Sequence, residues 1–234
     1  MNATFVLLPG LHGTGELFEP LLRVMPDGAQ RRVVTYPSDR ACGYGRLLRV
    51  IEEQVRGLEE VVLVGESFSG GLALRFAAEN PARVRAVILV ASFVTSSVPR
   101  VLCYLGSPLA LLRVPLPDVG IRCFLSGFRA RREVVRQTRR AVRAVSPVVV
   151  AHRVMQVSWL DARESLMRCR APILYLSGKR DRLVGARGAR RVQRVRSDVT
   201  VRAIDGPHLL LQVKPAESWR EMRRFVEGTG AMKG

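Results

Sequence analysis

The sequence predicts an α/β fold in which a mostly parallel sheet of about six strands is flanked by helices. Three observations support this prediction. Short runs rich in Val and Ile recur along the chain, amphipathic segments with helical spacing lie between them, and turn residues separate the two. Alternation of strand and helix requires crossover connections, and these produce parallel strands covered on both faces.

The predicted strands are runs of four to seven residues without polar alternation, as expected for strands buried on both faces. They cover residues 5–8, 32–36, 61–64, 84–90, 173–176 and 199–204. Helical spacing of apolar residues predicts helices over 47–58, 71–79 and 215–226. We treat the whole chain, residues 1–234, as a single domain.

One interval, about 94–170, holds no strand-like run and predicts a helical lid inserted between two strands. Within it, residues 129–145 place apolar side chains on one helix face and arginines on the opposite face. Solvent exposure is the simplest reading of the basic face. Weak association of this arginine-rich lid with anionic surfaces is the alternative.

The stretch VVLVGESFSGG places a serine at the point where a strand must turn at once into a helix. A residue at that apex is strained, and its neighbours two positions away must be small. Gly65 and Ser69 flank Ser67 at these positions, whereas centring the motif on Ser69 would give Ser67 and Gly71 that role. The strand register favours Ser67 at the apex, with Ser69 in the first helical turn as a cap or packing group.

A serine nucleophile needs a base, and the base needs an orienting carboxylate. His208 directly follows the last predicted strand, and Asp181 lies in the loop after the preceding one. Both are at carboxyl ends of strands, where parallel sheets build their sites. The chain order Ser67, Asp181, His208 is the order associated with this type of elbow. Rival acids are Asp161, Asp198 and Asp205, of which Asp205 is too near His208 in sequence to approach it from another loop.

These motifs together resemble the α/β-hydrolase superfamily over nearly the whole chain. The resemblance implies that Ser67 is the nucleophile, His208 the general base and then acid, and Asp181 the residue that orients the imidazole. Only four residues precede Phe5, so we expect a shortened amino-terminal part without the antiparallel strands that often open this fold. No metal or other cofactor is expected.

The stretch VLLPGLHGTGELFEPLL resembles the family's His-Gly loop, with Pro9-Gly10 in place of His-Gly. Aligning strand ends makes the backbone N–H groups of Leu11 and Phe68 the oxyanion donors. A shifted frame would use His12-Gly13 as the pair and Thr14 as the donor. His12 is then expected to order the loop or line the substrate pocket, and Trp159 of the lid is a second candidate for that pocket.

The composition, 47% apolar and 25% charged, is that of a globular protein, and the formal net charge is +18. The basic residues are spread along the chain with few aromatics between them, so no obligatory nucleic-acid partner is expected. Four scattered cysteines form no CxxC pair and predict neither a zinc site nor a disulfide framework. The N-terminus resembles no signal peptide, which makes the cytoplasm the expected compartment.

The sequence therefore predicts a serine esterase that cleaves small carboxylic esters of short to medium acyl chain through an acyl-enzyme. Acyl transfer or thioester cleavage would use the same residues, and the LPG-x-x-GTG opening also resembles esterase/lipase-like acyltransferases. The non-enzymatic alternative is a hydrolase-like scaffold that binds an anionic partner through its arginines. The sequence does not fix the oligomeric state.

Overall fold

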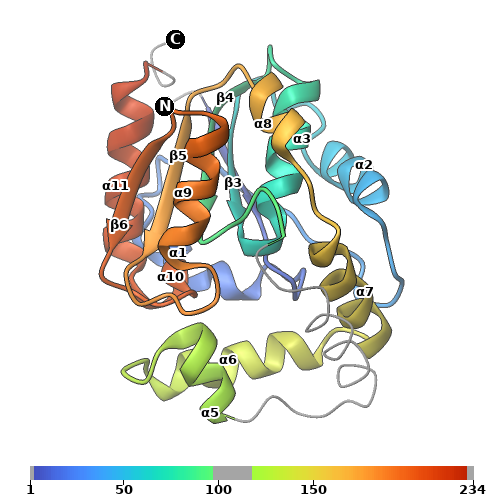
Figure 1. The fold of residues 1–234 in the computed structure, drawn as a ribbon, viewed down its shortest axis with the longest axis vertical. Coiled ribbons are helices and arrows are strands. Elements are labelled where there is room, and N and C mark those ends of the chain that lie inside the picture. Colours follow the sequence, from blue (N-terminus) through green and yellow to red (C-terminus); the bar gives the residue numbers. More distant parts are fainter. Residues whose placement is uncertain (1–2, 97–117, 231–234) are drawn as a thin grey trace.

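A computed structural model describes residues 3–96 and 118–230 of the chain. Its centre is a six-stranded sheet in the order β2-β1-β3-β4-β5-β6, and every neighbouring pair of strands is parallel (Figure 1). The strands are β1 (Thr4–Leu8), β2 (Arg31–Val33), β3 (Val61–Glu66), β4 (Val84–Val90), β5 (Ile173–Gly178) and β6 (Thr200–Ile204). The α/β prediction is thus confirmed.

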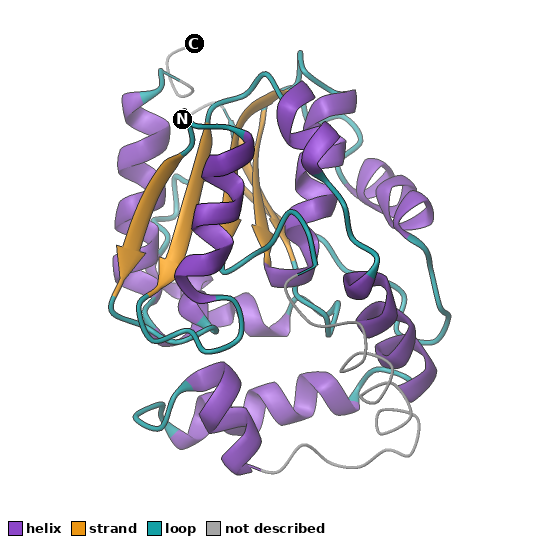
Figure 2. Ribbon diagram, viewed as in Figure 1, coloured by secondary structure: helices purple, strands orange, loops and turns teal. Residues whose placement is uncertain are grey.

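Helices cover both faces of the sheet (Figure 2). One face packs against α2 (Tyr44–Gln54), α3 (Gly70–Glu79), α8 (Arg163–Arg168) and α9 (Gly185–Val195). The other packs against α1 (Glu19–Val24), which follows the short turn η1 (Glu16–Phe18), and against α10 (Leu210–Val213) and α11 (Pro215–Gly228). Strands β3 and β5 are buried along their whole length, which is why the first four residues of each are apolar.

Between β4 and β5 the described chain is helical, and we call residues 118–168 the cap. It contains α5 (Asp118–Gly120), the π-helical turn η3 (Ile121–Ser126), α6 (Arg132–Arg143), α7 (Pro147–Ser158) and α8. Helices α5, α6 and α7 lie beyond the carboxyl edge of the sheet (Figure 1). The expected lid segment also includes residues 97–117, which lie outside the described residues.

Several expected elements differ from the structure in their bounds, among them a strand and a helix. The second strand ends at Val33 rather than at residue 36, because the backbone N–H and carbonyl groups of Thr35 pair with the side-chain amide of Gln54 instead of with β1. The helix expected over 129–145 spans Arg132–Arg143, with its buried stripe formed by Val134, Val135, Thr138 and Ala141. No helix among the described residues is long and apolar enough to cross a membrane.

Candidate active site at the carboxyl edge of the sheet

The turn after β3 has the geometry expected of a nucleophile elbow. Ser67 adopts a positive φ of 49°, a strained conformation for a residue with a side chain. A Cβ at Gly65 would lie 2.9 Å from the Ser69 carbonyl oxygen and 3.0 Å from the Ala73 Cβ, so only glycine fits there. Ser92, which follows the neighbouring strand β4, donates its hydroxyl to the Ser67 carbonyl oxygen at 2.7 Å and so stabilises the strained turn. The side chain of Ser67 is therefore fixed at the sheet edge.

His208 lies against Ser67. Its Nε2 is 3.0 Å from the Ser67 Oγ, and its Nδ1 is 3.0 Å from Oδ2 of Asp181. A carboxylate can only accept, so the Nδ1–H donates to Asp181 and the Nε2 is left to accept from the serine hydroxyl. The side chains of His208 and Asp181 are only 4% and 1% exposed, so this pair is shielded from water.

Asp181 remains ionised in this setting. Burial by itself raises the pKa of the Asp181 carboxyl, but the hydrogen bond and charge of His208 lower it more, and the net shift is downward. The backbone N–H groups of Leu183 and Val184 also donate to Oδ1 of Asp181, at 2.8 and 3.0 Å. A carboxylate with these partners can orient an imidazole and stabilise it when protonated.

The rival acids lie elsewhere. Asp205 is paired with Arg180 at 3.3 Å, Asp198 with Arg196 at 2.8 Å, and Asp161 with Arg163. Asp181 reaches His208 because the loop after β5 and the loop after β6 lie in close contact. A Cβ at Gly178, the last residue of β5, would lie 2.4 Å from the Pro207 carbonyl oxygen.

The hydrogen bonds of the loop after β1 distinguish between Leu11 and Thr14 as the residue whose N–H could bind the oxyanion. The Thr14 N–H donates to Nδ1 of His12 at 3.1 Å and is therefore engaged. The Leu11 N–H donates to no atom of the described residues. The geometry thus favours the frame in which Leu11 and Phe68 supply the amides.

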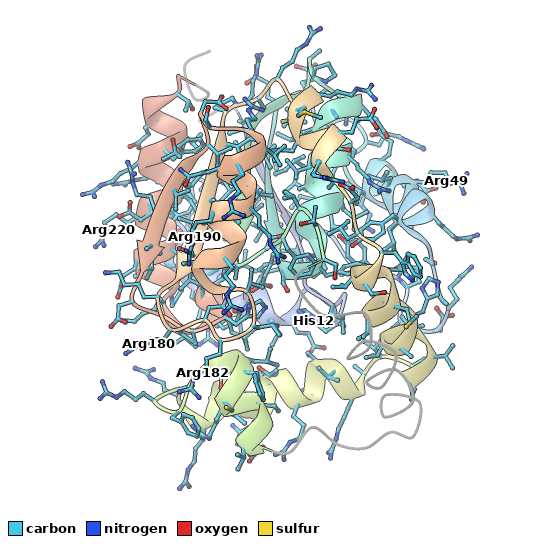
Figure 3. The ribbon with its side chains drawn as sticks, viewed as in Figure 1. His12, Arg49, Arg180, Arg182, Arg190 and Arg220 are labelled. Atoms are coloured by element: carbon cyan, nitrogen blue, oxygen red, sulfur yellow. The ribbon has the colours of Figure 1, made fainter. Side chains whose placement is uncertain are left out.

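His12 is an ordering residue of this loop and lies between the sheet edge and the cap (Figure 3). Its Nδ1 also lies 3.0 Å from the Thr14 hydroxyl, and its side chain is mostly buried. Burial and the neighbouring charge of Arg153 lower the pKa of His12 to about 4, so the ring is neutral near pH 7.

Ser69 has a different role from the helix cap that the sequence suggested. It precedes α3 with φ −82° and ψ −3°, and its side chain makes no capping hydrogen bond. An N-cap residue usually has extended geometry, which lets its oxygen turn toward the helix amides. Instead the buried Ser69 hydroxyl donates to the Pro9 carbonyl oxygen and lies 2.7 Å from the Tyr36 hydroxyl. Ser69 therefore ties the elbow to the loop after β1.

Arg153 of α7 is a site residue that the sequence did not reveal. It is 1% exposed, and its Nη1 and Nη2 donate to the carbonyl oxygens of Leu11 and Pro37 at 2.9 and 2.8 Å. A Cβ at Gly13 would lie 2.4 Å from its Nη1, so the glycine makes room for the guanidinium. Within the described residues no carboxylate pairs with Arg153, and burial lowers its pKa. The cap is thus attached directly to the loop that carries Leu11.

Glu66, next to Ser67, is a second residue that the sequence analysis missed. It is buried, and Nε2 of Gln212 donates to its Oε1 at 2.9 Å. Burial raises the pKa of the Glu66 carboxyl, and the Gln212 hydrogen bond, the charge of His208 and the Gly10 amide offset only part of this rise. The signal that could have identified Glu66 is an acidic residue at the end of a buried strand, because buried carboxyl groups almost always have a partner.

Trp159 directly follows α7 and is 58% exposed. It lines a surface cavity of about 270 Å³ that contains none of the three residues Ser67, Asp181 and His208. The other lining residues are Tyr44, Arg75, His152, Met155, Gln156 and Leu160. Tyr44 stacks on Phe68 with ring centroids 5.2 Å apart, so the cavity lies behind the Phe68 ring. Leu11 and His12 lie in the loop after β1 and Phe68 directly follows the serine, whereas Trp159 lines a cavity that does not include the serine.

The arrangement can move a proton from the Ser67 hydroxyl to His208 while Asp181 stabilises the resulting imidazolium. Among residues 3–96 and 118–230, no group of three or more His, Cys, Asp or Glu side chains could hold a metal ion. Cys42, Cys123 and Cys169 are free thiols, and Cys103 lies outside the described residues.

Comparisons with known proteins agree with this architecture. Residues 5–221 match the family model described as the alpha/beta hydrolase family. No match was found among curated protein sequences.

Several solved structures share the fold. An esterase (EaEST) from Exiguobacterium antarcticum has a TM-score of 0.85 at 16% identity, covering 96% of this chain and 92% of that one. The hydrolase olei00960 from Oleispira antarctica also has a TM-score of 0.85, at 13% identity and with 97% and 92% covered. A bromoperoxidase from Bacillus anthracis has a TM-score of 0.83 at 19% identity, again with 97% and 92% covered. Identities this low establish the fold alone, but the family model spans most of the sequence, and the chain therefore belongs to the alpha/beta hydrolase family.

Proposed function

We propose that this protein is a serine hydrolase that cleaves carboxylic esters of short to medium acyl chain through an acyl-enzyme. The observation that supports the proposal is the hydrogen-bonded series Ser67, His208 and Asp181, with both links at 3.0 Å. Each of these residues follows a different strand, at the one edge of the sheet where parallel strands build their sites.

In the first half-reaction the Ser67 Oγ attacks the ester carbonyl carbon while its proton passes to Nε2 of His208. The N–H groups of Leu11 and Phe68 donate to the oxyanion that forms, and such a donor contributes about 2.7–4 kcal/mol to the transition state. The tetrahedral intermediate then collapses. The C–O bond to the alcohol breaks, the alcohol takes the proton from His208, and the acyl group stays on Ser67.

In the second half-reaction a water molecule gives a proton to His208 and attacks the acyl carbon. Collapse releases the carboxylic acid and returns the proton to Ser67. An acceptor alcohol or a thioester substrate could use the same residues, so acyl transfer and thioester cleavage are the alternatives. The expected compartment, the cytoplasm, stays a prediction.

The test is the Ser67→Ala variant, assayed with p-nitrophenyl esters of increasing acyl length and with a fluorophosphonate label. We expect the wild type to be labelled, and we expect the variant to lose labelling and about 10⁴-fold or more of its activity. Labelling of the variant equal to that of the wild type would refute the proposal. Product analysis with and without an acceptor alcohol separates hydrolysis from transfer.

A further inference from the structure

The outer edge of the cap exposes three apolar side chains. Val119, Phe124 and Phe128 are 67%, 52% and 59% exposed, and they lie within ten residues of one another in the sequence. Val119 lies in α5, and Phe124 lies in the π-helical turn η3 that follows it directly. Phe128 follows on the loop between η3 and α6.

Arginines hold and surround these apolar residues. The Arg122 guanidinium donates to the carbonyl oxygens of Phe128 and Ala130 at 3.2 and 3.0 Å, which fixes the loop. Arg182, from the loop after β5, lies 5.8 Å from the centre of the Phe128 ring and 3.3 Å from the sulfur of Cys123. We define the cap edge as Val119, Arg122, Phe124, Phe128, Arg129, Arg131, Arg132 and Arg182.

The charge of the cap edge is not balanced locally. Residues 118–146 contain eight arginines against two acidic residues, Asp118 and Glu133. These two acids pair with Arg139 and Arg136 of α6. Arg129, Arg131, Arg132 and Arg182 are exposed and form no ion pair with any described residue. Their charge is therefore available to an anionic partner.

The cap edge also borders the candidate active site. The Leu209 N–H, next to His208, donates to the Leu125 carbonyl oxygen of η3 at 2.9 Å. A Cβ at Gly127 would lie 3.3 Å from the Pro207 Cβ. In Figure 3, Arg182 lies where the loop after β5 meets the cap.

We propose that the cap edge docks on the surface of an anionic phospholipid bilayer. Phe124, Phe128 and Val119 insert among the headgroups and upper acyl chains, while the unpaired arginines bind the lipid phosphates. Exposed apolar residues flanked by cations are the pattern of interfacial membrane binding. A nucleic acid would also attract the arginines, but a surface that includes an aliphatic side chain offers bases less to stack on than it offers lipid. Docking there sets the bilayer beside the His208 loop.

The test uses full-length protein carrying Ser67→Ala, so that the result does not depend on whether the protein hydrolyses esters. Co-sedimentation is measured with vesicles of phosphatidylcholine alone and with vesicles containing phosphatidylglycerol. We expect binding only to the anionic vesicles, weakening as salt rises because the charges are exposed. Each basic residue near such a surface contributes about fivefold, so R129Q/R131Q/R132Q should lower the partition coefficient about 100-fold. F124S/F128S should lower it about tenfold or more.

The matched control is R46Q/R49Q/R56Q, which removes the same charge from exposed arginines in and after α2. Arg49 lies far from the cap edge (Figure 3), and none of the three has an ion pair with a described residue. The control should retain vesicle binding, and all variants should match the thermal unfolding of the parent. The proposal is overturned by no binding to anionic vesicles, by equal losses in the two arginine triples, or by F124S/F128S binding like the parent. Cap-dependent binding of a single-stranded oligonucleotide in preference to the vesicles would overturn it as well.

Discussion

Replacing Arg153 by methionine tests how strongly the loop of Leu11 depends on the cap. Methionine fills the space of the arginine's aliphatic stem but carries no donor, so the Leu11 and Pro37 carbonyl oxygens would both lose their partner. A hydrogen bond from a charged donor contributes about 1.5–3 kcal/mol, whereas removing a buried, unpaired guanidinium relieves a desolvation cost of several kcal/mol. Since these terms oppose each other, we expect the free energy of unfolding to fall by only about 1–3 kcal/mol.

The effect on catalysis should be larger than the effect on stability. If the Leu11 N–H stabilises the oxyanion, losing it outright would lower kcat about 10²–10³-fold. A more mobile loop would lose only part of this stabilisation of the transition state. We therefore expect kcat for p-nitrophenyl butyrate to fall about 10–100-fold while KM changes less than about threefold. The oxyanion exists only in the transition state, which is why the loss should appear in kcat. Arg153→Lys should recover part of the rate, because an ammonium can reach one of the two carbonyls.

Arg143→Met is the matched control, because Arg143 is an exposed cap arginine at the end of α6. Steady-state kinetics and urea unfolding are measured for all three variants and the wild type. A folded Arg153→Met variant with kcat within about twofold of the wild type would show that other contacts hold Leu11. A loss confined to KM would contradict the reasoning equally, since it would indicate a binding role.

Three further predictions concern buried polar groups. His12 has a pKa of about 4 against an ordinary 6.5, so on acidification the unfolded chain gains this proton first, and stability is lost between those two pH values. His12→Asn, which cannot titrate, should abolish about 3 kcal/mol of this loss in urea unfolding series from pH 7 to pH 4. Glu66 has a raised pKa, so its contribution to stability is full below 4.5 and falls as pH rises toward the folded value. Glu66→Gln keeps an acceptor for Gln212, and its melting temperature relative to the wild type should increase from pH 4.5 to neutral pH; a constant difference would contradict this. Ser69→Ala leaves the buried Tyr36 hydroxyl without that partner and should cost about 1–3 kcal/mol in urea unfolding; a change near zero would mean the site relaxes.

The sequence predicted the parts of the site that depend on chain order and strand ends. Ser67 followed from the register of one apolar run, and Asp181 and His208 followed from their positions after the last two strands. These signals are local, because a parallel sheet brings all its carboxyl ends to one edge. The structure extends β3 by two residues to Glu66, so the apex residue remains Ser67.

The parts that the sequence did not reveal depend on contacts between distant segments. Arg153 carries no local signal in a chain with so many arginines, and only the fold shows that it is buried against the loop of Leu11. The same holds for Ser69, whose bonds to Pro9 and Tyr36 join three strand ends. The spacing of the motif predicts that a small residue is needed at this position. Whether that residue caps a helix depends on its backbone angles, which tertiary contacts determine.

The cap is joined to the site on two opposite sides, and this bears on how a substrate could enter. Arg153 attaches α7 to the loop of Leu11, while the Leu125 carbonyl oxygen attaches η3 to the loop of His208 through the Leu209 N–H. Swinging the cap away as one rigid flap would break these two charged hydrogen bonds and this backbone hydrogen bond together, along with other contacts such as the hydrogen bond from the Ser146 N–H to the Ser38 carbonyl oxygen. At about 1.5–3 kcal/mol for each charged bond and about 1 kcal/mol for the other, the first three bonds alone cost roughly 4–7 kcal/mol, which leaves an open population of at most about 10⁻³ to 10⁻⁵. Access that depends on smaller movements of one segment preserves both attachments, and it keeps the amide of Leu11 in place while the acyl group enters.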